Sequence, residues 1–195
     1  MAASEERLRA RMAEARRNRG KLIAAATEAF AAGSRPVHLE AIARAAGVGI
    51  GTLYRHFPTR AALVEAVYLD QVDRLQTAAR VLLDEHPPDV AFRMWTSSFL
   101  DWAATKHGMG ETLREVVDKE APVAGDMRSR LVALVSDFLG AGARSGSFRA
   151  DVDASDVAGL LAGVLIVAGA QRPHAERMLQ IIAEGIRDPA AGAVE

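Results

Sequence analysis

Apolar side chains recur every three or four residues along most of this chain, the spacing that places them on one face of an α-helix. In the first third, such stretches cover 21–32, 39–46 and 50–57. A glycine or a proline follows each of them, as is typical where a helix ends. A much longer stretch starts at Thr59 and ends before Pro87. The first third therefore predicts three helices that lead into a long fourth helix.

The second half follows the same pattern. Its apolar stripes predict helices at 89–106, 111–118, 122–143, 156–170 and 172–187. Gly108 and Gly110 are expected to break the chain between the first two of these. Asp153 or Ser155 is expected to cap the fourth. Because no stretch alternates as a strand does and no repeat is present, the sequence predicts an all-α protein of about nine helices.

The composition sets limits on this fold. The 195 residues are 50% hydrophobic and 25% charged, which is ample for a buried core. The lack of cysteine excludes disulfides and cysteine-based zinc sites. The longest apolar stretch, 157–170, has 14 residues, whereas a membrane-spanning helix needs roughly 20. No apolar run follows the early arginines as it would in a signal peptide, so we expect a soluble cytoplasmic protein.

Charge is distributed unevenly along the chain. The formal net charge is −1, yet residues 1–60 hold eleven Lys and Arg against five Glu, a charge of +6. The other 135 residues therefore carry −7. A basic first part joined to an acidic remainder indicates two modules, 1–60 and 61–195, of which the first faces a polyanion. The alternative is an ordinary solvated face rich in charge.

Three glycines crowd the segment AGVGIGTLYRHF at 46–57. Glycine-rich segments often bind phosphate, but this one lacks the lysine of a nucleotide-binding P-loop. A dinucleotide fingerprint is also disfavoured, because a helix precedes the glycines and Thr52 breaks the GxGxxG spacing. The segment fits a helix-turn-helix better, since Ala43 is small where the two helices cross and Gly47 can bend the turn. The apolar residues that would lock both helices to a third are Ile42, Val48, Leu53 and Phe57.

The second helix of such a motif enters the major groove of DNA. With Leu53 and Phe57 inward, a period of 3.6 turns the other side of the helix outward. The outward residues are Gly51, Thr52, Arg55 and His56, with Tyr54 at the flank. Arg55 can reach a guanine edge or a phosphate, and Thr52 a base edge or a phosphate. Tyr54 and His56 have donors that reach backbone phosphates.

Gly49 and Gly51 add to the predicted phosphate contacts at the start of this helix. Neither carries side-chain bulk, so backbone N–H groups there can approach a phosphate closely. The glycines of the segment are therefore expected to hold phosphate, but the phosphate of DNA.

Residues 20–66, and above all AIARAAGVGIGTLYRHFPTRAALVEAV, resemble the N-terminal DNA-binding domain of the TetR family of bacterial transcriptional repressors. The resemblance is close over about a quarter of the chain and otherwise lies in helical layout. It implies that Thr52 and Tyr54 contact DNA and that His56 binds backbone phosphate. It also implies that Arg60, in place of the usual lysine, holds phosphate. Ile50 and Arg55 lie at positions that commonly help to choose the DNA sequence.

Two positions depart from the family pattern. His38 stands where the family usually has a threonine that caps the second helix, so the hydroxyl of the usual cap is missing here. Gly49 replaces a frequent serine, which removes one possible phosphate contact. The arginines from Arg7 to Arg19 either extend the first helix or form a loose arm against the DNA, and the alternative to a DNA contact is a frayed, solvated terminus.

The resemblance also implies a ligand pocket among the central helices. Its expected wall is an aromatic stripe at spacings of three and four, with two methionines as adaptable lining. These ligand-site candidates are Phe92, Trp95, Phe99, Trp102, Met109 and Met127. Thr96, Ser97 and Ser98 on the same helix offer polar groups. The competing interpretation is that the stripe is simply part of the core.

The last two helices, about 155–187, predict a dimer interface. The segment ASDVAGLLAGVLIVAGA is apolar nearly all round, and Gly159 and Gly163 permit close approach of another helix. Burial within one subunit is the alternative. The overall prediction is a homodimeric repressor that binds a near-palindromic operator and is released by a small-molecule effector, with no cofactor, no metal and no catalytic site. An activator of the same fold, and a helical enzyme or carrier, are the rival hypotheses.

Overall fold

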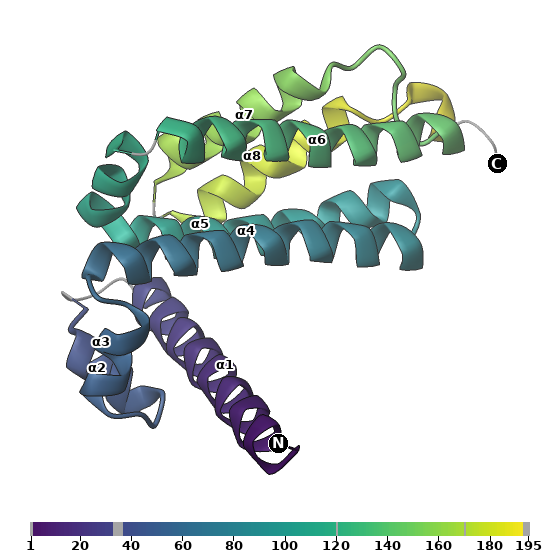
Figure 1. Ribbon diagram of the computed structural model, residues 1–195. Coiled ribbons are helices and arrows are strands. Elements are labelled where there is room, and N and C mark those ends of the chain that lie inside the picture. The colour runs from purple at the N-terminus through teal and green to yellow at the C-terminus, as the bar shows by residue number, and fades with distance from the viewer. Residues whose placement is uncertain (1, 33–36, 120, 170, 193–195) are drawn as a thin grey trace. The chain divides into compact units, whose positions relative to one another are not determined.

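The computed structural model describes residues 2–32, 37–119, 121–169 and 171–192. Its eight α-helices are α1 (Ala2–Ala31), α2 (Leu39–Ala45), α3 (Ile50–His56), α4 (Arg60–Glu85), α5 (Pro88–Lys119), α6 (Ala121–Ser145), α7 (Ala154–Ala168) and α8 (Arg172–Gly185). A short 3-10 helix at Pro189–Gly192 follows (Figure 1). Within those ranges there is no strand, only an isolated bridge between Phe148 and Arg187. The predicted all-α fold of about nine helices is confirmed.

Two boundaries differ from the sequence prediction. Helix α1 begins at Ala2, before the start at residue 21 that the apolar pattern predicts. Of the two alternatives for the arginines from Arg7 to Arg19, the structure therefore has the extension of the first helix. Residues 2–20 are rich in Ala, Arg and Glu, which form helices readily but leave no apolar stripe for periodicity to detect. The second boundary lies within α5, which consists of two helices joined across a kink at Gly110 (φ 52°, ψ −130°). The expected break between these helices is confirmed at Gly110, whereas Gly108 lies within the helix that precedes the kink.

Gly108 has a different structural role. A Cβ atom placed on it would collide with the backbone carbonyl of Phe30 in α1. The residue is thus a point of close approach between α5 and α1, which only a glycine allows.

The chain divides into two compact units, residues 1–70 with 105–116 and residues 71–104 with 117–195. We call them the head unit and the body unit. Helices α4 and α5 each contribute residues to both. The functional division at residue 60 stays a prediction.

The core of the head unit is built from all four N-terminal helices. Its best-buried side chains are Leu22, Ala26 and Phe30 from α1, Ile42 and Ala43 from α2, Leu53 from α3, and Leu63, Val64 and Val67 from α4. Helix α1 packs against both α2 and α3 (Figure 1). Because α2 and α3 have seven residues each, they are too short to be stable alone and depend on this packing.

The body unit holds the aromatic core. Phe92 lies edge-on to Phe138 and Phe148, with ring centroids 5.5 and 6.0 Å away. Helix α7 packs on both α6 and α8, and the three lie side by side in Figure 1.

Candidate nucleic-acid interface and ligand pocket

The turn between α2 and α3 has the geometry that the glycines predicted. Gly47 has a φ of +67°, in the left-handed region that glycine tolerates best. The backbone N–H of Val48 donates to the carbonyl of Ala43 at 3.0 Å, which closes the turn on the end of α2. Gly49 then begins α3, because its carbonyl accepts from the N–H groups of Thr52 and Leu53 at 2.9 and 3.2 Å.

Helix α3 has one buried side and one open side. Leu53 is fully buried, and Phe57, which ends the helix, is nearly so. On the open side Tyr54 is 46% exposed, and Ile50 and Arg55 are exposed as well. The candidate residues Gly49 and Gly51 are also exposed, whereas Thr52 and His56 are half-buried. The structure thus presents the predicted set on one short helix, with two of its members partly covered.

Arg60 lies differently from the other candidate DNA contacts. Its guanidinium donates through Nη1 to the carbonyl of Val37 and through Nε to Oγ1 of Thr112, the latter at 3.3 Å. It also lies over the ring of Phe30, 5.7 Å from the centroid. These contacts are within the head unit and tie the start of α4 to α1 and α5. A phosphate contact by Arg60 stays a prediction.

The ends of α2 and α4 differ in their caps. His38 is the N-cap residue of α2 but makes no side-chain hydrogen bond there, as the departure from the family pattern suggested. At the start of α4, Oγ1 of Thr59 accepts from the backbone N–H of Ala62 at 3.1 Å. Only the second of these helices has a satisfied side-chain cap.

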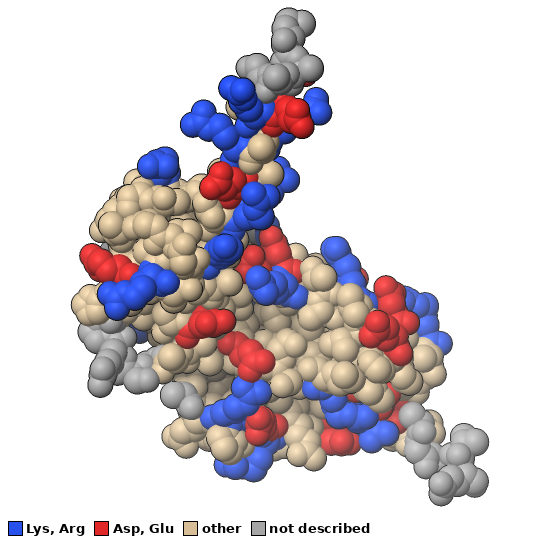
Figure 2. Space-filling model, turned by 90° about the horizontal axis from the view of Figure 1, so that it is seen from below, with Lys and Arg blue, Asp and Glu red and all other residues tan. Residues whose placement is uncertain are grey.

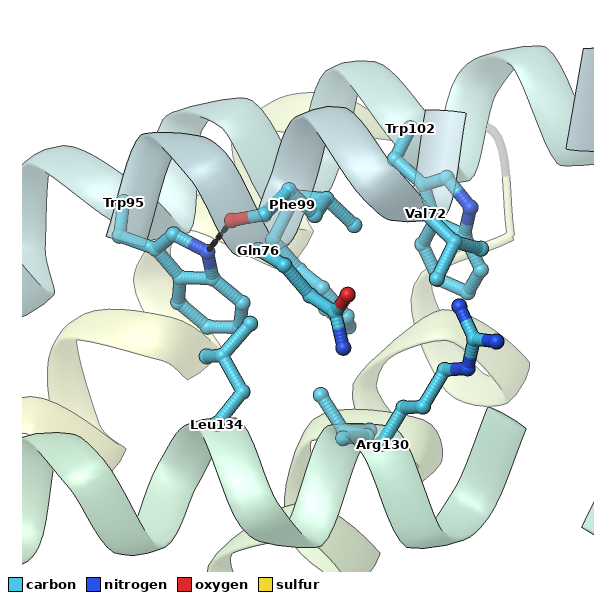
Figure 3. Close-up of a pocket in the computed structure, with 9 residues that line it drawn as sticks. Val72, Gln76, Trp95, Phe99, Trp102, Arg130 and Leu134 are labelled. Carbon is cyan, nitrogen blue, oxygen red and sulfur yellow. Dashed lines mark hydrogen bonds between the residues drawn. The ribbon is translucent and has the colours of Figure 1, made fainter. Parts of the chain in front are cut away.

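The aromatic stripe of α5 is buried in the body unit. The ring centroids of Trp95 and Phe99 are 5.4 Å apart, and those of Phe99 and Trp102 are 5.5 Å apart. The indole N–H of Trp95 donates to the carbonyl of Leu75 at 3.2 Å (Figure 3). The stripe is therefore a packed part of the core in this state, which was the competing interpretation.

Three of the same rings also line a small cavity. Its other walls come from α4 and α6, and its full lining is Val72, Leu75, Gln76, Trp95, Phe99, Trp102, Arg130, Leu131 and Leu134. The open space is about 20 Å³, room for about one water molecule. Three of the six ligand-site candidates thus line a small cavity, and the effector pocket stays a prediction.

The remaining ligand-site candidates do not line this cavity. Phe92 packs against other aromatic rings, and Met109 belongs to the head unit. The side chain of Met127 lies outside the described part of the structure. The hydroxyl of Thr96 donates to the carbonyl of Arg93 at 2.7 Å, and Ser97 accepts from Arg172. Ligand binding by all of these residues stays a prediction.

Gln76 and Arg130 are the polar lining residues that sequence reasoning missed. Both point toward the space between the rings in Figure 3. Nη1 of Arg130 is 3.3 Å from Oδ1 of Asp73, so the mouth of the cavity carries an ion pair between α6 and α4. Gln76 lies four residues after Val72, and Arg130 lies four residues before Leu134. This spacing places each on an apolar face of its helix, but it does not show that the two residues share a cavity.

Helices α7 and α8 expose apolar side chains that no described residue covers. Ile166 is 83% exposed and Ile181 is 72% exposed, and Leu160 and Val167 are exposed too. We call these four residues the apolar patch. Gly163 adds open space, because a Cβ on it would meet nothing within 4 Å. In many proteins, exposed groups of large aliphatic side chains contact another molecule.

The start of α7 is well capped. Oδ1 of Asp153 accepts from the backbone N–H of Ser155 at 2.7 Å and from its hydroxyl at 2.6 Å. These hydrogen bonds hold the pKa of the Asp153 carboxyl below its usual range.

The described residues contain no group of three or more His, Asp or Glu side chains placed to bind a metal ion. Among the described helices, none has the length and apolar character that crossing a membrane requires.

The fold and the turn between α2 and α3 define a helical protein with an N-terminal helix-turn-helix. Comparisons with known proteins indicate the same class. The model of the bacterial regulatory proteins of the tetR family matches residues 22–67. A model described as the C-terminal domain of SbtR-like transcriptional regulators matches residues 87–188. Among curated proteins, none matches the chain.

Solved structures give the family directly. A TetR transcriptional regulator from Streptomyces coelicolor is 42% identical, with a TM-score of 0.77 over 88% of this chain and 99% of that one. A second, from Mycobacterium vanbaalenii, is 34% identical, with a TM-score of 0.71 over 90% and 98%. A regulator from Cytophaga hutchinsonii is 18% identical, with a TM-score of 0.67 over 85% and 96%, and shows the fold alone. The chain belongs to the TetR family of transcriptional regulators.

Proposed function

We propose that the chain is a ligand-responsive repressor that binds a near-palindromic DNA operator as a homodimer in the cytoplasm and leaves it when a small-molecule effector binds. The observation that carries this proposal is the open side of α3, which presents polar and cationic groups from a helix whose other side is buried. A short, rigid helix of this kind fits the major groove of duplex DNA. Membership of a family of transcriptional regulators supports the same conclusion.

The proposed DNA contacts divide into two kinds. Arg55 and Ile50 read base edges, because their exposed side chains lie on the open side of α3. Phosphate contacts fix the position of the helix without reading the sequence. We assign these to Gly49, Gly51, Thr52, Tyr54 and His56, and to whichever N–H groups of Arg60 its contacts within the head unit leave available.

The apolar patch is the proposed centre of the dimer interface. Two α-helices from each subunit would then form a four-helix contact, which buries the patch on both sides. A two-fold axis between the subunits gives two copies of α3, which suits an operator whose halves are related by the same symmetry.

The cavity of the body unit is the proposed effector site. Trp95, Phe99 and Trp102 favour an apolar effector, and Gln76 and Arg130 supply the few polar groups that orient such a molecule. Because the cavity now holds about 20 Å³, an effector must widen it. Helix α4 lines the cavity at Val72 and, as one continuous helix, starts directly after α3. A shift of α4 is therefore the proposed link between effector binding in the cavity and release of DNA by α3.

The DNA part of the proposal is tested by measuring binding of the purified dimer to labelled duplexes from the promoter next to its own gene. We expect saturable binding that weakens steeply with salt, and no such preference for a scrambled duplex. Equal, weak binding to every duplex would overturn the proposal. A promoter–reporter assay then separates repression from activation, because only a repressor lowers transcription while it is bound.

Tryptophan fluorescence tests the proposed effector site. The chain has two tryptophans, Trp95 and Trp102, and both line the cavity. A true effector should change tryptophan emission and release the operator over the same concentration range. A molecule that releases DNA without changing emission would contradict the proposed site.

A further inference from the structure

The first turns of α1 form a basic extension, which we define as residues 5–21. It holds seven Lys and Arg and three Glu, a formal charge of +4 in 17 residues. All of its residues are exposed except Asn18, which is half-buried, and the buried core of α1 begins only at Leu22. The extension projects from its unit in Figure 2, with blue side chains on more than one side. The extension therefore contributes no side chain to the buried core of the described chain.

A helix of this kind gains little from the rest of its own chain. Its two large apolar side chains, Leu8 and Met12, are 59% and 61% exposed. Tertiary burial supplies most of the stability of helices in folded proteins, whereas a helix that is polar on all sides depends on its own propensity and on side-chain pairs within it. Apart from Arg19, which contacts Phe57, the extension therefore presents an exposed cationic surface that no other described segment buries.

The position of the extension relates it to the DNA-reading helix. The guanidinium of Arg19 lies over the ring of Phe57, 5.2 Å from the centroid, and Phe57 is the residue that ends α3. From this contact the helix runs back through 14 residues to Glu5, which at 1.5 Å per residue is about 21 Å. Half a turn of B-DNA is about 17 Å. The extension is thus long enough to reach phosphates beyond the groove that α3 would occupy.

We propose that the basic extension is a second DNA-contact element, which binds backbone phosphates beside the base pairs read by α3. This inference rests on the proposed function. The positive charge favours duplex DNA as the partner, because its phosphates attract the Lys and Arg side chains and release counterions when these bind. A membrane surface is disfavoured, because Leu8 and Met12 are too few for the apolar face of an interfacial helix. Phosphate contacts carry no sequence information, so the extension adds affinity rather than specificity.

The test replaces the five outermost arginines by glutamine, which keeps helix propensity while it removes charge. The test variant carries Arg7→Gln, Arg9→Gln, Arg11→Gln, Arg16→Gln and Arg17→Gln in the full-length chain. Binding to operator and to scrambled duplex is measured by fluorescence anisotropy between 50 and 200 mM salt. If the helix presents two of the five cations to phosphates, the salt slope should fall by about 2. We expect the affinity for both duplexes to fall by a similar factor, about tenfold or more.

A control variant loses the same charge from exposed arginines of the body unit. It carries Arg80→Gln, Arg93→Gln, Arg128→Gln, Arg144→Gln and Arg149→Gln. Its salt slope should stay within experimental error of the wild type. A second variant with lysine at the five positions of the extension should keep most of the slope, because it keeps the charge.

Each outcome bears on the inference. An unchanged slope in the glutamine variant, or an equal loss in the body control, overturns the role of the extension. A loss of operator preference in place of a uniform loss also overturns it, and so does tighter binding of the wild type to anionic vesicles than to duplex DNA at the same salt concentration. If the wild-type chain fails to bind any duplex at low salt, the proposed function itself fails, which is a distinguishable result.

Discussion

Helices α3 and α7 both expose much of their surface, and the comparison of the two explains how one chain presents surfaces for two kinds of partner. Helix α3 exposes polar and cationic groups around Tyr54 and Arg55. Helix α7 exposes aliphatic side chains, with Ile166 the most exposed large hydrophobic residue described. The first surface suits a hydrated, charged partner and the second suits an apolar one. Exposure alone therefore does not indicate which kind of molecule a surface binds, whereas the chemistry of the exposed groups indicates the kind of partner that it suits.

The two surfaces should also respond differently to solvent conditions. Contacts with phosphate release counterions, so they weaken as salt rises. Burial of aliphatic side chains depends little on salt and gains from the removal of apolar area from water. Each prediction below tests one side of this contrast.

The largest effect is expected from charges placed in the apolar patch. Ile166→Glu combined with Ile181→Glu should convert the dimer to a monomer, because the interface would have to bury carboxylates without partners. Loss of the second half-site contact should then weaken operator binding by about 10²- to 10⁴-fold. Sedimentation velocity measures the mass and fluorescence anisotropy measures the affinity.

The matched control for the patch is Val81→Glu. Val81 is exposed on α4 but does not belong to the patch. This variant should remain a dimer with wild-type affinity for DNA. A doubly substituted protein that sediments as a dimer would show that the interface lies elsewhere.

On the exposed side of α3, Arg55→Ala should weaken operator binding by about 1–3 kcal/mol and relax the sequence preference at one base-pair position.

Tyr54→Ala should instead weaken binding to all duplexes and reduce the salt slope by about 1. Competition against a set of single-base operator variants separates the two. An unchanged base preference in the Arg55 variant would show that its role is misassigned.

Two glycine substitutions separate stability from DNA binding. Gly108→Ala should destabilise the head unit by about 1–3 kcal/mol, because the new methyl group collides with the backbone of Phe30. Gly51→Ala should stabilise α3 by up to about 1 kcal/mol, since a Cβ there meets nothing within 4 Å. It should nevertheless weaken DNA binding, because the methyl group stands where a phosphate would approach.

Thermal unfolding measures the stability of the two glycine variants, and fluorescence anisotropy on the same samples measures their affinity for DNA. A Gly51 variant that is more stable but binds DNA as the wild type does would show that Gly51 does not contact DNA.

Much of the fold follows from local pattern, and the parts that do not are set by distant contacts. The period of apolar residues located the helices, and Gly47 marked the turn before α3. The inward position of Arg60 depends on Thr112, which lies 52 positions away in the chain, and no local pattern reports such a contact. Gln76 and Arg130 join the cavity for the same reason, because three separate helices must meet before their side chains share a space.

The sequence left the start of α1 open between two alternatives for a different physical reason. Apolar periodicity detects a helix by the face that it buries, and the basic extension buries no face. Its helix is visible only through propensity, because Ala, Arg and Glu favour the helical backbone without any tertiary contact. Patterns of apolar residues thus locate helices that pack against the chain, and they underestimate helices that bury no face.

The smallest effect concerns the helix ends, where α2 and α7 differ. Asp153 caps α7 with two short hydrogen bonds, whereas His38 at the same position of α2 makes none. His38→Asp should therefore stabilise the head unit by about 0.5–1 kcal/mol, because the new carboxylate can accept from an N–H group in the first turn. His38→Ala, measured by the same thermal unfolding, is the control and should change stability little. Since α2 holds α3 in place, a tighter α2 should leave base preference unaltered, and a gain from alanine equal to that from aspartate would show that the histidine itself is unfavourable.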